Sequence, residues 1–406
     1  MGTSVLWLLP FAALLLAIAI LPLVVPGRWS RPGFQAIVVS LAALPVVLGR
    51  PQGLGHAARD YVAFILLVGA LYVVASGVRV TGDVPAHPAT NTGLLLLGGI
   101  LASIIGTIGA SVLLIQIVLE INSARKNVSH TVLFFILLVS NVGGCLTPLG
   151  NPPLFLGYLA GVPLLWPLRL AGEWAVAVGL LTGVYYLLER RAYARESPVA
   201  ILAEETTKRP IRVAGRWNLL LLAGIVLATA FLRSPFREGA SLACAAASFP
   251  LTPRGQRAKA GFSWYPILDV AILFAGIFIA MEPALVVLRE RAPGLGFTRP
   301  WQFFWAGGSL SALLDNAPTY AAFLAVARGL NRPEVAGVPA DILEALSAGA
   351  VFFGGLTYIG NAPNFLVRSI AVSRGVAMPS FFGYAARAAA VLLPLFLLLT
   401  FVFFRG

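Results

Sequence analysis

Residues 143–153 read Gly-Gly-Cys-Leu-Thr-Pro-Leu-Gly-Asn-Pro-Pro, and residues 354–363 read Gly-Gly-Leu-Thr-Tyr-Ile-Gly-Asn-Ala-Pro. Both stretches lie inside long apolar runs, where Gly and Pro interrupt a helix and no water can satisfy the freed backbone groups. Two matched broken helices in the two halves of a membrane chain are typical of the binding site of a secondary transporter. The alignment that starts at Thr147 and Thr357 also pairs Gly150 with Gly360, Asn151 with Asn361 and Pro153 with Pro363.

The composition around these stretches indicates a polytopic membrane protein. The chain has 406 residues, of which 59% are hydrophobic and 11% are charged, whereas a soluble globular domain is roughly 25% charged. Apolar runs of about 20 residues, long enough to cross a bilayer, recur from end to end. No catalytic triad, phosphate-binding glycine loop or nucleotide-binding motif is present, so we do not expect an enzyme.

The formal net charge of +13 reflects positively charged loops. Clusters around Arg28, Arg125, Arg190 and Arg254 stand between apolar runs, so topology and anionic lipid explain them better than nucleic acid does. The positive-inside rule places these loops in the cytoplasm and the N-terminus outside. Short loops and the absence of a targeting segment favour a prokaryotic inner (plasma) membrane.

Threading the chain through these loops predicts about ten spanning helices, two of them broken. We expect the continuous ones at about 4–25, 33–49, 60–79, 168–189, 217–232, 239–250, 264–288 and 381–403, and the broken ones at 131–159 and 342–370. Two further runs, 93–121 and 301–327, start and end on the same side and are predicted to be re-entrant hairpins. Their tips are expected at Gly106–Ser111 and Asp315–Tyr320.

The two halves match in sequence but are predicted to run in opposite directions through the membrane. The predicted fold is therefore an all-α polytopic membrane protein, an inverted-repeat secondary transporter with its pseudo-two-fold axis in the membrane plane. We expect N-terminal scaffold helices over 1–59, repeat 1 over 60–195, a cytoplasmic loop and linking helices over 196–263, and repeat 2 over 264–406.

The two tips and the two breaks are expected to converge near the middle of the membrane. Carbonyl groups freed at a break suit Na⁺, and freed N–H groups suit an anion. Neutral side-chain oxygens would add to the ligands of a hard cation, although each of them could equally cap a broken helix end. The nearest ligands are expected to be Asn316, Thr319, Thr357, Asn361 and Asn364, and Thr107, Ser111, Asn141, Thr147 and Asn151 would complete the site from the other repeat.

Asp315 is the residue on which the functional prediction depends. It stands in the middle of an apolar run whose nearest basic residues, Arg299 and Arg328, lie at the ends of that run. A carboxylate in hydrocarbon is costly, so an intramembrane acid indicates function. One carboxylate that holds either H⁺ or Na⁺, but not both, is sufficient for exchange; a helix-capping role at the hairpin tip is compatible with this. Glu282, late in a spanning helix, is a second candidate, either as a proton relay or as an acid that reaches the outer interface.

These stretches resemble known transporters. Residues 147–153 resemble the Gly-Thr-Pro-Pro-type loop of the divalent-anion/sodium symporters, and residues 311–318 (Ser-Ala-Leu-Leu-Asp-Asn-Ala-Pro) resemble the Asp-Asn-x-Pro hairpin of NhaD-type sodium/proton antiporters. Both groups belong to the ion-transporter superfamily, which also holds arsenite and citrate carriers. The second half, including residues 358–364 and 378–383, is most similar to sodium/proton antiporters and citrate-type transporters.

The resemblance covers roughly residues 60–405. It implies a scaffold domain, a transport domain built from hairpins and broken helices, an elevator-like movement and a homodimer. The chain departs from the carboxylate symporters at its first hairpin, where Gly106-Thr-Ile-Gly replaces their Ser-Asn-Thr. That departure favours one acidic, asymmetric cation site.

We therefore expect a secondary active transporter that exchanges Na⁺ (or Li⁺) for H⁺ across the bilayer, with these ions as cargo and no resident cofactor. The alternative is Na⁺- or H⁺-coupled transport of a di- or tricarboxylate such as citrate, held by Asn151, Asn361 and the half-helix N-termini. No Lys or Arg is expected at mid-membrane depth in the repeats, since Arg328 and Arg368 are placed near helix ends, and this favours a cation. A channel would need a continuous polar path, which closed breaks argue against.

Overall fold

The computed structural model describes residues 3–83, 85–125, 127–196, 209–259, 262–332 and 334–405. These ranges are helical almost throughout, and seven of their helices are long and apolar enough to cross a membrane. The predicted all-α polytopic class is confirmed. One small sheet within the described ranges, an antiparallel pair of β1 (Arg79–Asp83) and β2 (Arg209–Ala214), was not predicted. Two lysines of the positively charged loops, Lys126 beside Arg125 and Lys208 in the loop that follows Arg190, lie outside the described residues.

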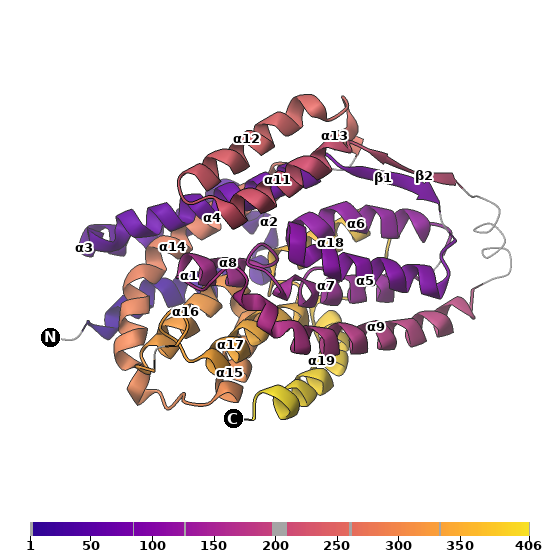
Figure 1. The fold of residues 1–406 in the computed structure, drawn as a ribbon. Coiled ribbons are helices and arrows are strands. Elements are labelled where there is room, and N and C mark those ends of the chain that lie inside the picture. The colour runs from indigo at the N-terminus through magenta and orange to yellow at the C-terminus, as the bar shows by residue number, and fades with distance from the viewer. Residues whose placement is uncertain are drawn as a thin grey trace.

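The N-terminal helices pack around one long helix of the second half (Figure 1). This helix, α14 (Tyr265–Arg291), contacts α1 (Leu8–Val24), α3 (Pro32–Gly49) and α4 (Leu54–Ala75). Phe64 of α4 stacks on Phe274 of α14 with ring centroids 4.5 Å apart. Leu6, Leu41 and Leu48 are 70%, 67% and 75% exposed on the outer side of this group, as expected of side chains that face lipid tails.

The remaining elements outside the repeats are short or flank this group. The helices α11 (Trp217–Phe231) and α12 (Phe236–Leu251) pack on each other and on α4. The short turns are η1 (Val5–Trp7), α2 (Pro26–Trp29), η2 (Pro51–Gly53), η4 (Trp166–Leu170), α13 (Gln256–Lys259) and η5 (Ala292–Gly294).

Each predicted hairpin is present and is turned by a single residue. Gly106 joins α5 (Pro88–Ile105) to α6 (Thr107–Ile121) with φ 82° and ψ 149°. Asp315 joins α15 (Pro300–Leu314) to α16 (Asn316–Arg328) with nearly the same backbone, φ 75° and ψ 142°. The tips are therefore narrower than predicted, because the residues from Thr107 and from Asn316 onward already belong to helices.

Both broken helices are also present. The first consists of α7 (Ser129–Leu138), η3 (Val142–Cys145) and α8 (Pro152–Leu159), and the second of α17 (Ala340–Phe353), η6 (Gly354–Leu356) and α18 (Ala362–Ser373). The first break spans residues 139–151 and so begins before Thr147, where the sequence placed it. Asn141 explains the earlier start, because its side chain bonds the Ile136 carbonyl and competes with the helix ladder.

The two-fold relation between the repeats is visible in how the second helix of each hairpin packs against the second helix of a broken helix. In the contact pattern α6 packs against α18, and correspondingly α16 packs against α8. In Figure 1 the labels α8 and α16 lie to the left of the labels α6 and α18. The two repeats thus leave the centre in opposite directions, as an inverted repeat requires.

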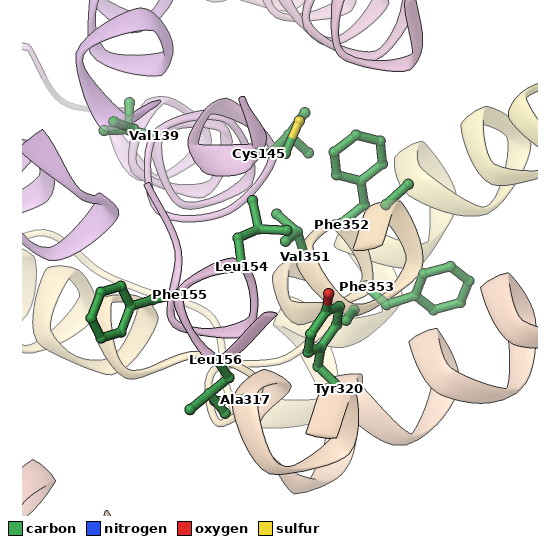
Figure 2. Close-up of a cluster of buried hydrophobic side chains, with 14 of the residues drawn as sticks. Val139, Cys145, Leu154, Phe155, Leu156, Ala317, Tyr320, Val351, Phe352 and Phe353 are labelled. Atoms are coloured by element: carbon green, nitrogen blue, oxygen red, sulfur yellow. The ribbon is translucent and has the colours of Figure 1, made fainter. Parts of the chain in front are cut away.

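The apolar core surrounds the breaks (Figure 2). Tyr320 of α16 lies beside α8, where a Cβ on Gly157 would come within 2.6 Å of its hydroxyl oxygen. On the other side, α19 (Phe381–Phe403) covers the second break: the hydroxyl of Tyr384 donates to the Gly355 carbonyl at 2.9 Å, and Phe396 stacks on Phe353 at 4.0 Å. The long helix α9 (Ala171–Tyr193) packs against η3 of the first break and against α5.

Candidate functional site

The first hairpin tip is bonded to the first break. The backbone N–H of Thr107 donates to the Gly150 carbonyl at 2.8 Å, and the hydroxyl of Thr147 donates to the Ser103 carbonyl. Further along α6, the hydroxyls of Ser111 and Ser140 lie 2.9 Å apart and are fully buried. These contacts fix the tip and the break of repeat 1 as one unit.

The second hairpin is bonded to the second break in the corresponding way. The hydroxyl of Thr357 donates to the Ala312 carbonyl, just as the hydroxyl of Thr147 donates to the Ser103 carbonyl in repeat 1. At the tip, the hydroxyl of Thr319 donates to the Asp315 carbonyl at 2.8 Å. The hydroxyl protons of Thr147 and Thr357 are therefore used in holding each break to its hairpin, and that of Thr319 is used within the second tip, so only oxygen lone pairs remain for a cation.

The two breaks are joined to each other by asparagines. Asn141 donates to the Asn364 amide oxygen at 2.8 Å, and Asn361 donates to the Ser140 carbonyl at 2.8 Å and to the Asn141 amide oxygen at 3.2 Å. Asn364 in turn donates to the carbonyls of Gly354 and Thr357. All three asparagines are at most 1% exposed, so this network stabilises the contact between the repeats.

Truncating this network is expected to destabilise the protein. Asn364→Ala removes one of the two hydrogen bonds that Asn141 Nδ2 donates and both bonds that Asn364 donates to backbone carbonyls, which should lower the free energy of unfolding by about 2 kcal/mol. A thermal unfolding curve of the purified protein measures the loss. Asn127→Ala, at an exposed asparagine, is the matched control and should leave the curve unchanged. Equal curves for the two variants would show that the asparagine network adds nothing to stability.

A second asparagine pair connects the first break to the second hairpin tip. The Asn316 amide donates to the Asn151 amide oxygen at 2.9 Å, and both side chains are buried. Asn151 Nδ2 and Asn316 Oδ1 have no hydrogen-bond partner in the described structure. Exchanging O and N in both amides keeps the mutual bond and again leaves one donor and one acceptor free. The pair therefore offers one unused donor and one unused acceptor, whichever way the amides are oriented.

Asp315 adjoins this pair at the hairpin tip. Its carboxylate oxygen accepts a hydrogen bond from the Ala317 backbone N–H at 3.2 Å, so the predicted capping role is present. The side chain is half-buried, and it takes part in none of the ion pairs found among the described residues. Its backbone lies in a region that is strained for any residue other than glycine, and glycine occupies the equivalent position, Gly106.

The predicted ligands thus fall into four contacting groups around the tips and breaks. No three His, Cys, Asp or Glu side chains of the described ranges lie close enough together to hold a metal ion. A cation bound beside the second tip would therefore be held mainly by neutral oxygens, together with the carboxylate of Asp315. Neutral oxygens with one carboxylate suit a hard, weakly held cation.

Glu282 lies elsewhere. Its side chain fills the space beside Gly53 before α4, where a Cβ would come within 2.2 Å of Glu282 Cγ, and its charge interacts with those of His56 and Asp60. None of its recorded contacts is to the tips or breaks. The structure therefore does not bring Glu282 together with the other predicted residues.

Two residues that contact the breaks, Ser103 and Arg368, were not predicted from the sequence. Ser103 accepts from Thr147 through its carbonyl, and its hydroxyl donates to the Gly143 carbonyl; its place on a helix face gave no signal of this. Arg368 was expected near a helix end, but its guanidinium reaches back over the ring of Tyr358 in the second break, with Cζ 4.8 Å from the ring centroid. Its Nε is buried and has no hydrogen-bond partner in the described ranges, so a basic group does approach the second break.

Comparison with known families agrees with this architecture. The sequence model of a family described as "putative citrate transport" matches residues 1–404. No curated protein matches the chain.

Proposed function

The chain belongs to this citrate-transport family, and on that premise we propose that it is a secondary active transporter in which Asp315 carries the coupling cation. In the favoured form, Na⁺ (or Li⁺) and H⁺ alternate on this carboxylate, so that the protein exchanges the two ions. The oxygens of Asn316, Thr319 and Thr357 would complete the cation site from repeat 2, and those of the first break would complete it from repeat 1.

The observation that carries the proposal is the backbone of Asp315. A non-glycine residue at φ 75° and ψ 142° costs about 1–3 kcal/mol. The equivalent turn in repeat 1 avoids that cost with Gly106. Retaining a strained carboxylate at the hairpin tip, in an apolar run and without a basic partner in the described residues, supports a role for its charge.

Two specific observations favour a second candidate, cation-coupled transport of a di- or tricarboxylate. The family is described by citrate transport. Beside Asp315, the Asn151–Asn316 pair offers a free donor as well as a free acceptor, and Arg368 lies at the second break with its Nε unpaired in the described structure. A hydrogen-bond donor and a guanidinium suit a bound carboxylate group, whereas a site for a cation alone needs neither of them.

Purified protein in proteoliposomes distinguishes the candidates. If the favoured form is correct, a Na⁺ pulse dissipates an imposed pH gradient without any organic anion, and the effect weakens as the pH falls because protons compete for the same carboxylate. Na⁺-dependent accumulation of labelled citrate, without Na⁺-driven proton movement, would replace the first candidate by the second. Ion currents far above carrier turnover would contradict both, since they require an open pore.

A further inference from the structure

A cavity opens at the ends of α6 and α18 that face away from the breaks. The helix α6 starts at the first tip, α18 starts at the second break, and the two pack along each other. Beyond their last residues lies a cavity of about 460 Å³, bordered by residues 122–123, 125 and 127–128 between α6 and α7 and by residues 374–377 after α18. This volume is in the range of small-molecule sites.

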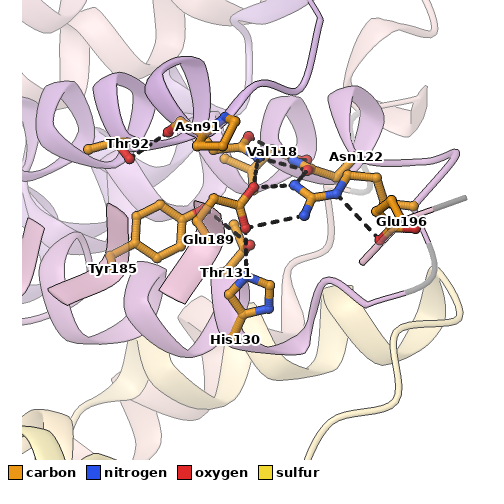
Figure 3. Close-up of polar contacts among 11 residues, drawn as sticks. Asn91, Thr92, Val118, Asn122, His130, Thr131, Tyr185, Glu189 and Glu196 are labelled. Carbon is orange, nitrogen blue, oxygen red and sulfur yellow. Dashed lines mark hydrogen bonds and ion pairs between the residues drawn. The ribbon is translucent and has the colours of Figure 1, made fainter. Parts of the chain in front are cut away.

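The cavity is lined by three arginines, Arg79, Arg125 and Arg374, and one acidic residue, Glu120. Arg125 is held rigidly: its guanidinium pairs with Glu189, which also bonds His130 and Asn91 (Figure 3). Its side chain is 1% exposed, and its buried Nε lacks a hydrogen-bond partner in the described structure. A second carboxylate, that of Glu196, has its Oε1 3.7 Å from this Nε. Arg125 is therefore largely neutralised, and it forms a fixed wall of the cavity.

The other two arginines keep their charge available. Neither Arg79 nor Arg374 forms an ion pair with a described residue, and the guanidinium of Arg374 donates to the amide oxygen of Gln116 at 3.0 Å. The first residue of α7, Ser129, also lines the cavity, and this helix begins without a side-chain cap. Uncapped N–H groups at a helix start carry a partial positive charge. Two arginines without an acidic partner among the described residues, together with this helix start, outweigh the single charge of Glu120.

We propose that this cavity binds a multivalent oxyanion such as phosphate, contacted by Arg79, Arg374 and the first turn of α7. The site is separate from the junction of tips and breaks. Its oxyanion has two possible sources, free phosphate and the phosphate group of an anionic lipid, since the flanking loops carry the positive charge expected at the membrane surface. A bound anion would connect the far end of the first hairpin to the far end of the second broken helix.

Thermal unfolding tests this proposal without a transport assay. Wild-type protein in neutral-lipid nanodiscs is heated with and without inorganic phosphate, at constant pH and constant ionic strength set with chloride. A parallel series replaces part of the neutral lipid by phosphatidylglycerol. The variants are Arg79→Gln/Arg374→Gln, Arg374→Gln alone, and the control Arg191→Gln, an exposed arginine of α9 that does not line the cavity.

A ligand that binds only the folded state raises the unfolding temperature. We expect phosphate or phosphatidylglycerol to raise it for the wild type and for Arg191→Gln, and to have little effect on the double variant; the arm that responds identifies the source. Arg374→Gln, at an exposed side chain, should lose part of the shift and gives the answer if the double variant folds poorly. Equal shifts in all proteins, or no shift in either arm, would overturn the proposal.

Discussion

Asp315→Asn is expected to reduce Na⁺-driven proton movement in proteoliposomes to the level of protein-free liposomes. The substitution keeps the size of the side chain and its ability to cap α16, but it removes the carboxylate at the second hairpin tip. Because an amide cannot alternate between a bound proton and a bound cation at neutral pH, exchange should stop. The rate of gradient dissipation after a Na⁺ pulse measures this directly.

Two further variants separate this effect from a loss of folding. Asp315→Gly installs the residue that turns the equivalent hairpin, so the backbone strain of about 1–3 kcal/mol is relieved. We expect it to unfold at or above the wild-type temperature and still to be inactive. Asp341→Asn, at an exposed acid in the first turn of α17, is the matched control and should transport normally. Transport by Asp315→Gly would show that the carboxylate has no part in coupling.

Gly150→Ala is expected to have the largest effect on the first break. A Cβ at this position would lie 2.2 Å from the carbonyl oxygen of Gly144 and 2.8 Å from its carbonyl carbon, both of them backbone atoms that cannot rotate away. We expect the free energy of unfolding to fall by about 3 kcal/mol, near the upper end of overpacking effects. Transport should fall as well, because the Gly150 carbonyl accepts the Thr107 N–H that holds the first hairpin tip.

A glycine with free space around it provides the control for this substitution. Gly179 lies within α9, and a Cβ there meets no atom within 4 Å. Gly179→Ala should therefore raise the free energy of unfolding by up to about 1 kcal/mol, as expected for a helix interior. Thermal unfolding of the two variants and the wild type compares them. A Gly150→Ala protein as stable as the wild type would mean that the backbone segments at Gly144 and Gly150 do not approach as closely as described.

The sequence was sufficient to predict which elements are irregular, because glycine, proline and asparagine interrupt helices for local reasons. The pairing of Thr147 with Thr357 and of Gly106 with Asp315 followed from the repeat, and the structure gives each pair the same hydrogen bond or the same turn. The extent of the breaks did not follow. The early end of α7 depends on a side-chain bond from Asn141 to Ile136, which apolar periodicity does not reveal.

The side-chain contacts between the repeats could not be predicted from the sequence, for a different reason. Asn141 and Asn364 have no counterparts in the opposite repeat, where Leu154 occupies the position equivalent to Asn364, so the alignment could not pair them. The contact of Arg368 with Tyr358 depends on the rotamer of Arg368 and on the direction of α18. From its position in the sequence, Arg368 could only be placed near a helix end. Long-range side-chain contacts of this kind arise only when the two halves pack.

The most direct measurement is proton release on cation binding. Na⁺ added to lightly buffered, purified protein should displace protons if Na⁺ and H⁺ share the Asp315 carboxylate, and a pH indicator records the release. We predict release from the wild type and from Asp341→Asn, and none from Asp315→Asn. Equal proton release from the wild type and Asp315→Asn would contradict the shared carboxylate on which this account depends.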